Sequence, residues 1–582
     1  MKYNFDEIID RKNTNCVKYD TAKMMHPELP EDFIPMWVAD MDFACPQPIL
    51  DAMKARLDKR ILGYSFIQDP EYFDAVVGWM KRRHDWDVAL DSIIYSAGVV
   101  RAMHTAVQEL TAPGDGVIIQ TPSYHPFHDA VVTNGRTEVR NALIEKDGHY
   151  EMDFDDLEEK AKDPHNKLFF LCSPHNPTGR VWTEEELRRV GEICFKNDVF
   201  VVCDEIHADF IRQGHKHIPF AKLFPDEKRL IVCTAPSKTF NLAGNQLSNI
   251  IIPDPVIAMK WKYGHLCGGP NPLSIDACKA AYNECENWVD ELNTYVEGNL
   301  RHLKARLDAE APVLKMQVPE GTYLAWIDAR ELEVETPDLM HELYLSGLFL
   351  EPGEDFVDNS KGYLRINVAC PRSVLDRAID ILIKCFHEGS ETLAELRSRK
   401  RLSVGETIPD FSYVTPYSGE KDLYEALNGK PTMLLFLRYY GCTVCQVDMH
   451  RLTEEYEKIT AAGGQVKVAL QSDPEALAKD TNGVDPFPFE IICDPELKLY
   501  HRFAIPVAES QDKLLGEKTI EKVGMAKELG LSHGRYEGEE LQLPASFLIL
   551  PDGRVAYARY GTDPGDTPDP EEIAELLKEN AD

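Results

Sequence analysis

Short, uninterrupted apolar runs alternate with segments of helical period through the first half of the chain. Polar residues bound each run, a pattern typical of parallel strands that are buried on both faces. Between two of these runs, residues 183–196 show the period of a crossover helix. We therefore predict an α/β, doubly wound large domain. Its expected strands are residues 115–120, 168–172, 199–203 and 230–234.

The pattern becomes more mixed further along the chain, at about residues 290–390. Here it predicts a smaller α+β subdomain, which N-terminal residues are expected to complete. Residues 322–327 and 362–368 are its expected strands.

A change of character near residue 388 predicts a domain boundary within residues 388–401. The basic run at 397–401 fits a solvated linker better than a docking patch, because charge runs are usually solvated. We thus expect a first domain over residues 1–395 and a second over residues 402–582. The second domain is predicted to contain a strand at 432–437.

Composition narrows the classes of partner. The 582 residues carry a formal net charge of −35, and such a surface repels nucleic-acid phosphates and anionic lipid headgroups. The chain shows no apolar signal segment and no run of about 18 uncharged apolar residues, so we expect a cytoplasmic protein without a membrane span. The 14 cysteines are scattered and many lie in apolar runs, which suits buried, reduced thiols.

Three predicted strands end in chemically distinctive residues. Lys238 follows strand 230–234, Asp204 follows strand 199–203, and Asn176 follows strand 168–172. Parallel strands bring their carboxyl ends to one edge of a sheet, where α/β proteins bind ligands. A lysine amine, an acid and an amide donor are what pyridoxal 5'-phosphate needs for its Schiff base, its ring nitrogen and its ring oxygen. A lysine after a strand is by itself usually a surface residue, but the joint occurrence predicts a site for this cofactor.

The cofactor's phosphate also needs a cradle. Gly98, Val99 and Val100 precede a helical pattern, and backbone N–H groups at a helix N-terminus bind anions. This segment is therefore the candidate phosphate site.

Longer motifs lie around these positions, at residues 35–43 (PMWVADMDF), 204–207 (DEIH), 237–244 (SKTFNLAG) and 363–372 (YLRINVACPR). With these motifs and Asn176-Pro-Thr-Gly, residues 1 to about 390 resemble the class I/II aminotransferases of fold type I. More narrowly, they resemble the C–S lyases of the MalY/PatB type, the cystathionine beta-lyase and cystalysin group. No metal ion is expected in such a site.

The resemblance implies roles for individual residues. Lys238 would form the Schiff base and act as the catalytic base, Asp204 would pair with the ring nitrogen, and Asn176 would bond the ring oxygen. Arg365 would grip the substrate carboxylate. Further implied contacts are Tyr124 stacked on the ring, His207 where many transaminases carry a tyrosine, the hydroxyls of Thr234 and Ser237 at the phosphate, and Tyr64 reaching the neighbouring subunit of a homodimer.

One departure bears on the reaction. Where aminotransferases carry Gly-x-Arg after the lysine, this chain reads Gly244-Asn-Gln246, as the lyase branch also does. This favours β-elimination of sulfur amino acids, giving a thiol or homocysteine, pyruvate and ammonia. An aminotransferase whose C-terminal domain is a docking or regulatory module remains the alternative.

The second domain contains a C-x-x-C pair, Cys442 and Cys445, after the strand at 432–437. A thiol at a helix N-terminus is stabilised as thiolate, and a second thiol one turn on can resolve a mixed disulfide. Half of a zinc site is the alternative, although the domain offers no partner pair.

Residues 402–582 resemble the redoxin (AhpC/TSA) branch of thioredoxin-like proteins, through GETIPDF at 405–411, DPELKLY at 494–500 and Pro544, the expected cis-proline. Peroxiredoxins carry Thr or Ser three residues before their peroxidatic cysteine, and proline further back. Here Cys442 and Arg438 hold those positions and Cys445 aligns with the peroxidatic cysteine. Dithiol–disulfide exchange with a thiol reductant is therefore favoured over peroxidase activity.

Overall fold

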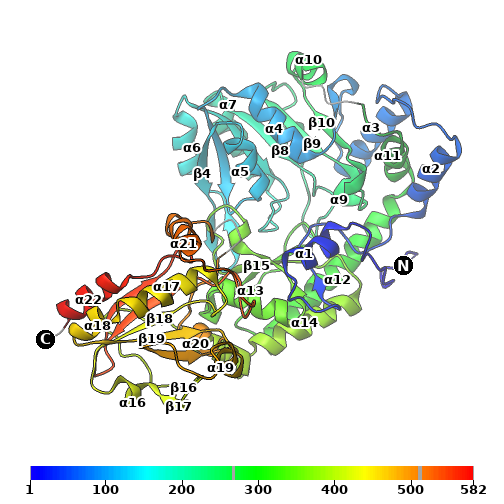
Figure 1. Cartoon of the computed structure of the whole chain (residues 1–582). Helices are drawn as coiled ribbons and strands as arrows, with labels where there is room; N and C mark the ends of the chain where they lie inside the picture. Colours follow the sequence, from blue (N-terminus) through cyan, green and yellow to red (C-terminus); the bar gives the residue numbers. More distant parts are fainter. Residues whose placement is uncertain (1, 265–268, 509–513, 581–582) are drawn as a thin grey trace. The chain divides into compact units, whose positions relative to one another are not determined.

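The computed structural model describes residues 2–264, 269–508 and 514–580. It divides into two compact units, Met1–Leu396 and Arg397–Asp582 (Figure 1). In the described part of the chain, none of the helices is long and apolar enough to cross a membrane.

The core of the first unit is a seven-stranded sheet in which the five strands from β9 to β4 run parallel, while β10 is antiparallel to both of its neighbours. The predicted fold class is thereby confirmed, and the four predicted strands are present to within two residues at each end. In sheet order the strands are β2 (Ile93–Ser96), β10 (Ser248–Ile251), β9 (Leu230–Thr234), β8 (Phe200–Asp204), β7 (Asn166–Cys172), β3 (Gly116–Thr121) and β4 (Thr137–Ala142).

Helices cover both faces of this sheet, because successive strand residues point to opposite sides. Phe170 belongs to the apolar cluster with Met103 of α4, and the adjacent Phe169 to the cluster with Leu187 of α7. The predicted helix is α7, which starts after Thr183 in a capping box with Glu186. One layer contains α4 (Val99–Leu110), α5 (His125–Val132) and α10 (Pro255–Gly264), and the other α6 (Phe154–Lys162), α7 (Glu184–Lys196) and α8 (Phe220–Leu223). Figure 1 shows these helices around the strands of the large sheet.

A four-stranded antiparallel sheet forms the smaller part of the unit, in the order β11 (Lys315–Met316), β12 (Leu324–Asp328), β15 (Tyr363–Asn367) and β14 (Glu351–Pro352). The N-terminal segment contacts this part of the unit: β1 (Ile34–Pro35) pairs with β13 (Leu348–Phe349). Beyond β1, Asn367 N–H donates to the Met36 carbonyl at 2.9 Å. The helices nearby are α12 (Glu286–Glu310), α13 (Thr336–Leu345) and α14 (Arg372–Phe386).

The predicted linker is partly helical. Helix α15 (Glu391–Ser398) lies in the predicted linker, and its Leu393 and Leu396 are buried in the core of the first unit. The basic residues at 397–401 gave no indication of this helix. The second unit is a seven-stranded mixed sheet in the order β17 (Gly419–Asp422), β16 (Ser412–Thr415), β20 (Glu490–Cys493), β19 (Gln465–Leu470), β18 (Thr432–Phe436), β21 (Ala545–Ile549) and β22 (Val555–Tyr560). Helices α17 (Thr443–Glu454) and α21 (Glu517–Glu528) pack against each other.

Candidate active sites

Three neighbouring strands of the large sheet end at the residues predicted to hold a cofactor. Lys238 lies in the short helix α9 (Pro236–Thr239) that follows β9, Asp204 is the last residue of β8, and Asn176 follows β7. Since β7, β8 and β9 are adjacent and parallel, these side chains reach the same edge of the sheet. The sequence prediction of their convergence agrees with this arrangement.

The amine of Lys238 is buried and makes a backbone contact. Its Nζ donates to the Ala39 carbonyl at 2.6 Å, and the same oxygen accepts the hydroxyl of Tyr323 at 2.8 Å. Burial and the nearby Arg365 charge lower the pKa of Lys238 to about 8. A fraction of this amine is therefore uncharged near neutral pH, as a nucleophile or a base requires.

Asp204 shows the opposite shift for the same reason. Burial raises its pKa to about 7, although the N–H of Ile206 donates to its Oδ1 at 3.0 Å and Lys238 lies nearby. A buried negative charge is costly when it is unpaired. A cationic ligand group next to Asp204 would therefore strongly stabilise its carboxylate form.

Arg365 of β15 is held by several chain groups at once. Its Nη1 donates to Asn176 Oδ1 at 3.0 Å, its Nη2 donates to the Trp37 carbonyl at 2.9 Å, and it is ion-paired with Glu351. The guanidinium also lies over the ring of Phe356, with the ring centroid at 5.0 Å. Its Nε is buried and lacks a hydrogen-bond partner among the described residues, and burial lowers its pKa to about 10. One donor of a fixed arginine is thus left for a ligand.

His207 and Tyr124 border this group of residues. Burial and the charges of Lys238 and Arg365 hold the pKa of His207 well below its ordinary value, so the ring is neutral at pH 7. Within the described chain its Nδ1 is buried without a partner. Tyr124 precedes α5, and burial raises its pKa.

The predicted phosphate cradle lies at the start of α4. Gly98 precedes the helix, which has no side-chain cap, and a Cβ built on Gly98 would meet open space. The first-turn N–H groups of Val99 and Val100 are therefore placed to receive an anion. Ser237 is half-buried in α9, whereas the hydroxyl of Thr234 donates to the Asn249 carbonyl at 3.1 Å.

Tyr64 is the predicted residue that the fold does not bring to the site of its own chain. Its side chain is completely exposed, between α2 (Gln47–Asp58) and α3 (Pro70–His84). A role at the site of a neighbouring subunit stays a prediction.

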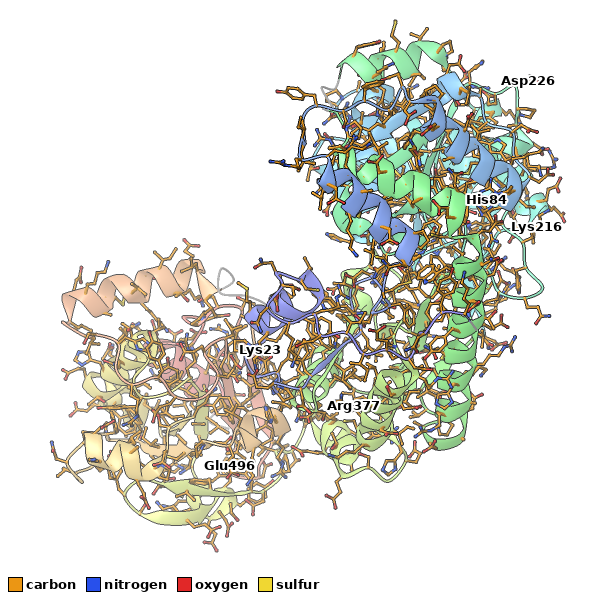
Figure 2. All side chains as sticks on the ribbon, turned by 90° about the vertical axis from the view of Figure 1, so that its right-hand side faces the viewer. Lys23, His84, Lys216, Asp226, Arg377 and Glu496 are labelled. Carbon is orange, nitrogen blue, oxygen red and sulfur yellow. The ribbon has the colours of Figure 1, made fainter. Side chains whose placement is uncertain are left out.

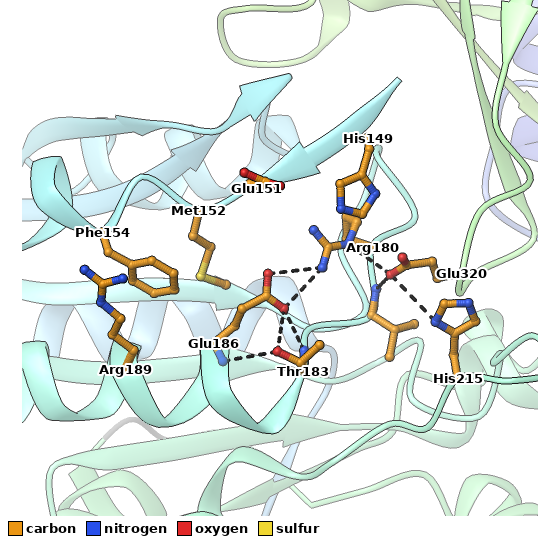
Figure 3. A pocket seen from close by; sticks show the side chains of 11 residues that line it. His149, Glu151, Met152, Phe154, Arg180, Thr183, Glu186, Arg189, His215 and Glu320 are labelled. Atoms are coloured by element: carbon orange, nitrogen blue, oxygen red, sulfur yellow. Dashed lines mark hydrogen bonds and ion pairs between the residues drawn. The ribbon is translucent and has the colours of Figure 1, made fainter. Parts of the chain in front are cut away.

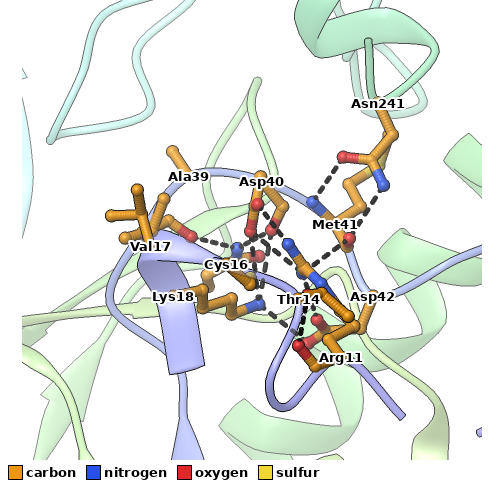
Figure 4. A network of polar contacts seen from close by, with 12 residues as sticks. Arg11, Thr14, Cys16, Val17, Lys18, Ala39, Asp40, Met41, Asp42 and Asn241 are labelled. Atoms are coloured by element: carbon orange, nitrogen blue, oxygen red, sulfur yellow. Dashed lines mark hydrogen bonds and ion pairs between the residues drawn. The ribbon is translucent and has the colours of Figure 1, made fainter. Parts of the chain in front are cut away.

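A network of charges that the sequence did not reveal fixes the segment around Ala39 (Figure 4). Arg11 bonds Asp42 Oδ1 at 2.6 Å and also pairs with Asp40, and the fully buried Lys18 bonds Asp42 Oδ2 at 2.7 Å. The side chain of Asn241, three residues after Lys238, brackets the backbone of Met41. Asp40 and Asp42 stand out as two acidic residues within the apolar motif at 35–43, and this could have indicated buried ion pairs. Their basic partners, Arg11 and Lys18, lie more distantly in the sequence and could not be assigned to them from the motif.

A second buried network of hydrogen bonds lies close in sequence to Lys238 and Asp204. Asp209 accepts the Thr239 hydroxyl at 2.7 Å and bonds His84 Nε2 at 3.1 Å. His84 is the last residue of α3 and is labelled in Figure 2. Glu205, next to Asp204, bonds the buried His217 at 3.0 Å. These pairs connect the loop after β8 with the lysine-bearing helix α9.

A cavity of about 610 Å³ lies elsewhere in the first unit, beside α7 (Figure 3). Arg180 in its wall is paired with Glu186 at 3.1 Å and with Glu320 at 3.0 Å. The two carboxylates neutralise this buried arginine, and none of the predicted site residues lines the cavity. It is therefore separate from the site at the sheet edge.

In the second unit, Cys442 is the residue immediately before α17 and Cys445 lies in the first turn of that helix. A hydrogen bond from Cys445, the Arg438 charge and helix N–H groups lower the pKa of Cys442 to about 7, although burial acts against them. Burial raises the pKa of Cys445 well above its ordinary value. The two thiols thus differ strongly, and Cys442 is the one that ionises.

Two expectations about the Cys442–Cys445 pair can be compared with the structure: the cis-proline at Pro544 and the alternative of a zinc site. The cis X-Pro bonds in the described chain precede Pro122, Pro174 and Pro177, and the bond before Pro544 is not among them. The expected cis-proline is therefore wrong: Leu543 N–H bonds the Pro506 carbonyl, and the chain enters β21 extended. Among the described residues, no group of three or more His, Cys, Asp or Glu is placed to hold a metal ion.

The fold and the strand-end residues define an enzyme of the aminotransferase architecture, and comparison with known families agrees. Residues 31–382 match the family Aminotransferase class I and II, and residues 404–558 match the AhpC/TSA family. The chain therefore belongs to the aminotransferase class I and II family and carries a C-terminal AhpC/TSA domain, as the two sequence resemblances predicted.

Among its relatives, cystathionine beta-lyase PatB of Bacillus subtilis is 44% identical over 377 residues, which cover 64% of this chain and 97% of that protein. Protein MalY of Escherichia coli is 31% identical over 391 residues, which cover 66% of this chain and 99% of that protein. Cystalysin of Treponema denticola, whose crystal structure contains pyridoxal 5'-phosphate, has 40% identity and a TM-score of 0.64, covering 66% of this chain and 98% of that one.

Replacing Lys18 with Ala is expected to lower the free energy of unfolding of the first unit by about 3 kcal/mol, because it leaves the Asp42 carboxylate buried with one partner fewer. Urea denaturation followed by circular dichroism measures the change. Lys54→Ala, which removes an exposed lysine, is the control, and equal midpoints for the two variants would contradict the prediction.

Alkylation of Cys442 is expected to rise with pH around a midpoint near 7, because the thiolate is the reactive form. Arg438→Gln removes a stabilising charge and should move the midpoint upward, slowing alkylation at pH about 6 by several-fold. Iodoacetamide labelling with peptide mapping by mass spectrometry measures the rate. Arg451→Gln, which removes an arginine near the C-terminal end of α17, is the control and should leave the midpoint in place.

Proposed function

We propose that the first unit catalyses pyridoxal 5'-phosphate-dependent β-elimination of sulfur amino acids, as a cysteine-S-conjugate β-lyase. Cystathionine or cysteine S-conjugates would be converted to homocysteine or another thiol, pyruvate and ammonia. The observation that carries the proposal is the meeting of Lys238, Asp204 and Asn176 at one sheet edge, with Arg365 bonded to Asn176. The names of PatB, MalY and cystalysin support the choice of reaction.

The residues present fit this cofactor. Lys238 offers a buried amine whose pKa is lowered to about 8, and Asp204 offers a carboxyl group that lacks a full cationic partner and would pair with the ring nitrogen. Asn176 Oδ1 already accepts from Arg365, which leaves its NH₂ group to donate to the ring oxygen. Tyr124 and His207 would flank the ring. The backbone amides of Gly98, Val99 and Val100, with the hydroxyl of Ser237, would hold the phosphate, whereas the Thr234 hydroxyl already donates to the Asn249 carbonyl.

When bound, the cofactor supplies an aldehyde that condenses with amines and a ring that accepts the electron pair left on Cα. The chain's residues do the rest. Arg365 would hold the α-carboxylate of the substrate with the donor that the chain leaves unused. Lys238, uncharged in part near neutral pH, would remove the Cα proton, and the sulfur group would then leave from Cβ.

We also propose that the enzyme works as a cytoplasmic homodimer. Tyr64 is fully exposed, and Ile61 (78%), Leu62 (57%) and Phe66 (64%) beside it expose much of their apolar surface. A second copy that covers this segment would bring Tyr64 towards the phosphate of its partner and would contribute to substrate binding there. Burial of these side chains would also provide the apolar contact area that stable association needs.

For the second unit we propose thiol–disulfide exchange. Cys442, whose pKa is lowered to about 7, would attack the substrate, and the buried Cys445 would resolve the product, with a thiol reductant restoring the pair. Peroxide reduction through Cys445 fits poorly, because burial raises the pKa of that thiol.

Lys238→Ala is expected to lower pyruvate formation from cystathionine by about a thousandfold or more, because the base and the cofactor's attachment point are both lost. A coupled pyruvate assay measures the rate, and the exposed Lys260→Ala is the matched control. Wild-type rates in the Lys238 variant would overturn the proposal. If added keto acids accepted the amino group while pyruvate and ammonia stayed low, the enzyme would be an aminotransferase instead.

Cys442→Ser is expected to abolish reduction of the disulfide of 2-mercaptoethanol. Cys445→Ser should instead trap a mixed disulfide on Cys442, visible as added mass on that peptide. Unchanged turnover in both variants would exclude a redox role for the pair and leave a docking module.

A further inference from the structure

A polar segment of the second unit passes directly beside the cysteine pair. Residues 532–540, here called the strap, connect α21 to β21 without regular structure. Gly534 N–H donates to the carbonyl of Gly441 at 2.8 Å, immediately before Cys442. Gln446, one turn into α17, donates to the Ser532 carbonyl at 3.1 Å. The strap is thus tied to the residues on both sides of the first thiol.

The other half of the strap is tied to the end of β18 and to β19. Glu540 is ion-paired with Arg438 at 3.1 Å and accepts the Tyr439 hydroxyl, which also bonds His533 Nε2 at 3.1 Å. Beyond β19, the Ser472 hydroxyl donates to Glu537 at 2.5 Å, and Glu539 N–H donates to Gln471 at 2.7 Å. These contacts span the strap from its first to its last residue.

The fit between the strap and the motif is close. A Cβ on Gly441 would lie 2.2 Å from the Arg535 carbonyl oxygen, and one on Gly534 would lie 3.0 Å from Gly441 Cα. With the strap in place, only 2% of Cys442 and 3% of Cys445 are exposed. A thiolate must reach a disulfide sulfur directly, and thiols as buried as these are out of reach of a disulfide on a folded protein.

We propose that the strap restricts the Cys442–Cys445 pair to low-molecular-weight disulfides. This inference rests on the thiol–disulfide exchange proposed above for the same unit. A small disulfide needs only a local opening of the strap, whereas a protein disulfide needs the strap removed from the motif altogether.

The reaction balances as follows. The Cys442 thiolate forms a bond to one sulfur of the small disulfide RSSR, whose S–S bond breaks to release RS⁻. Cys445, losing its thiol proton to solvent, then attacks Cys442 Sγ and releases the second RS⁻, so that two electrons pass from the protein dithiol to RSSR. A dithiol reductant returns the Cys442–Cys445 disulfide to the reduced state.

The test compares two reagents with the same reactive group on the reduced full-length protein. N-ethylmaleimide is expected to label Cys442, as read by peptide mapping, while a polyethylene-glycol maleimide should label it at least roughly tenfold more slowly than it labels an unfolded control. The disulfide of 2-mercaptoethanol should be turned over, and insulin disulfides should not. Equal labelling of Cys442 by both reagents, or rapid insulin reduction, would overturn the proposal.

A strap variant adds the converse result. Gly534→Val forces the strap away from Gly441 and should raise both polymer labelling and insulin reduction by roughly tenfold or more. Gly524→Val in α21, where a Cβ meets open space, is the matched control, and Gln446→Ala replaces the strap variant if that chain fails to fold. No gain in either strap variant would contradict the proposal. If Cys442 is labelled selectively by the small reagent but reduces neither disulfide, the exchange function fails while the steric restriction stands.

Discussion

The cofactor site depends on the contact between the amine of Lys238 and the carbonyl of Ala39. This carbonyl lies in a segment without regular structure. Its position comes from backbone bonds on either side, from Asn367 N–H to the Met36 carbonyl and from Asp42 N–H to the Ala369 carbonyl, and from side chains. Arg11 and Lys18 contribute by pairing with Asp40 and Asp42. The Lys18–Asp42 pair is buried, and there an ion pair holds geometry although its net stabilisation is small. The N-terminal segment is therefore part of the site, through β1 and through these pairs.

Burial shifts the pKa of each of these ionisable groups, and the charges and hydrogen bonds around each group determine the final pKa. In the first unit, burial is the largest cause that favours the neutral forms of Lys238 and Asp204, and the Arg365 charge adds to it at Lys238. In the second unit, the partners of Cys442 overcome burial, and those of Cys445 do not. The same solvent exclusion thus favours an uncharged amine in one unit and gives the two thiols different pKa values in the other.

Much of this could be predicted from local sequence. The strands β7, β8 and β9 are continuous apolar runs, and their ends carry Asn176, Asp204 and Lys238, so that strand period and sheet topology alone predicted their meeting. The clamp on Arg365 could not be predicted, because Glu351 and Trp37 reach it from other strands and loops. The strap could not be predicted either: a polar segment without periodicity gives no sign of what it covers. Pro544 was misjudged because a resemblance transfers the position of a proline but not its peptide geometry.

The bond between Glu540 and Arg438 couples the position of the strap to the ionisation of Cys442. Arg438 is ion-paired with Glu540, and its charge also lowers the pKa of Cys442, so the two anions share one cation. By thermodynamic reciprocity, a closed strap makes the thiol harder to ionise, and an ionised thiol makes the strap easier to open. Under the proposed exchange, the loss of the Cys442 proton would therefore also loosen the strap, so that the thiolate would form where a small disulfide can reach it.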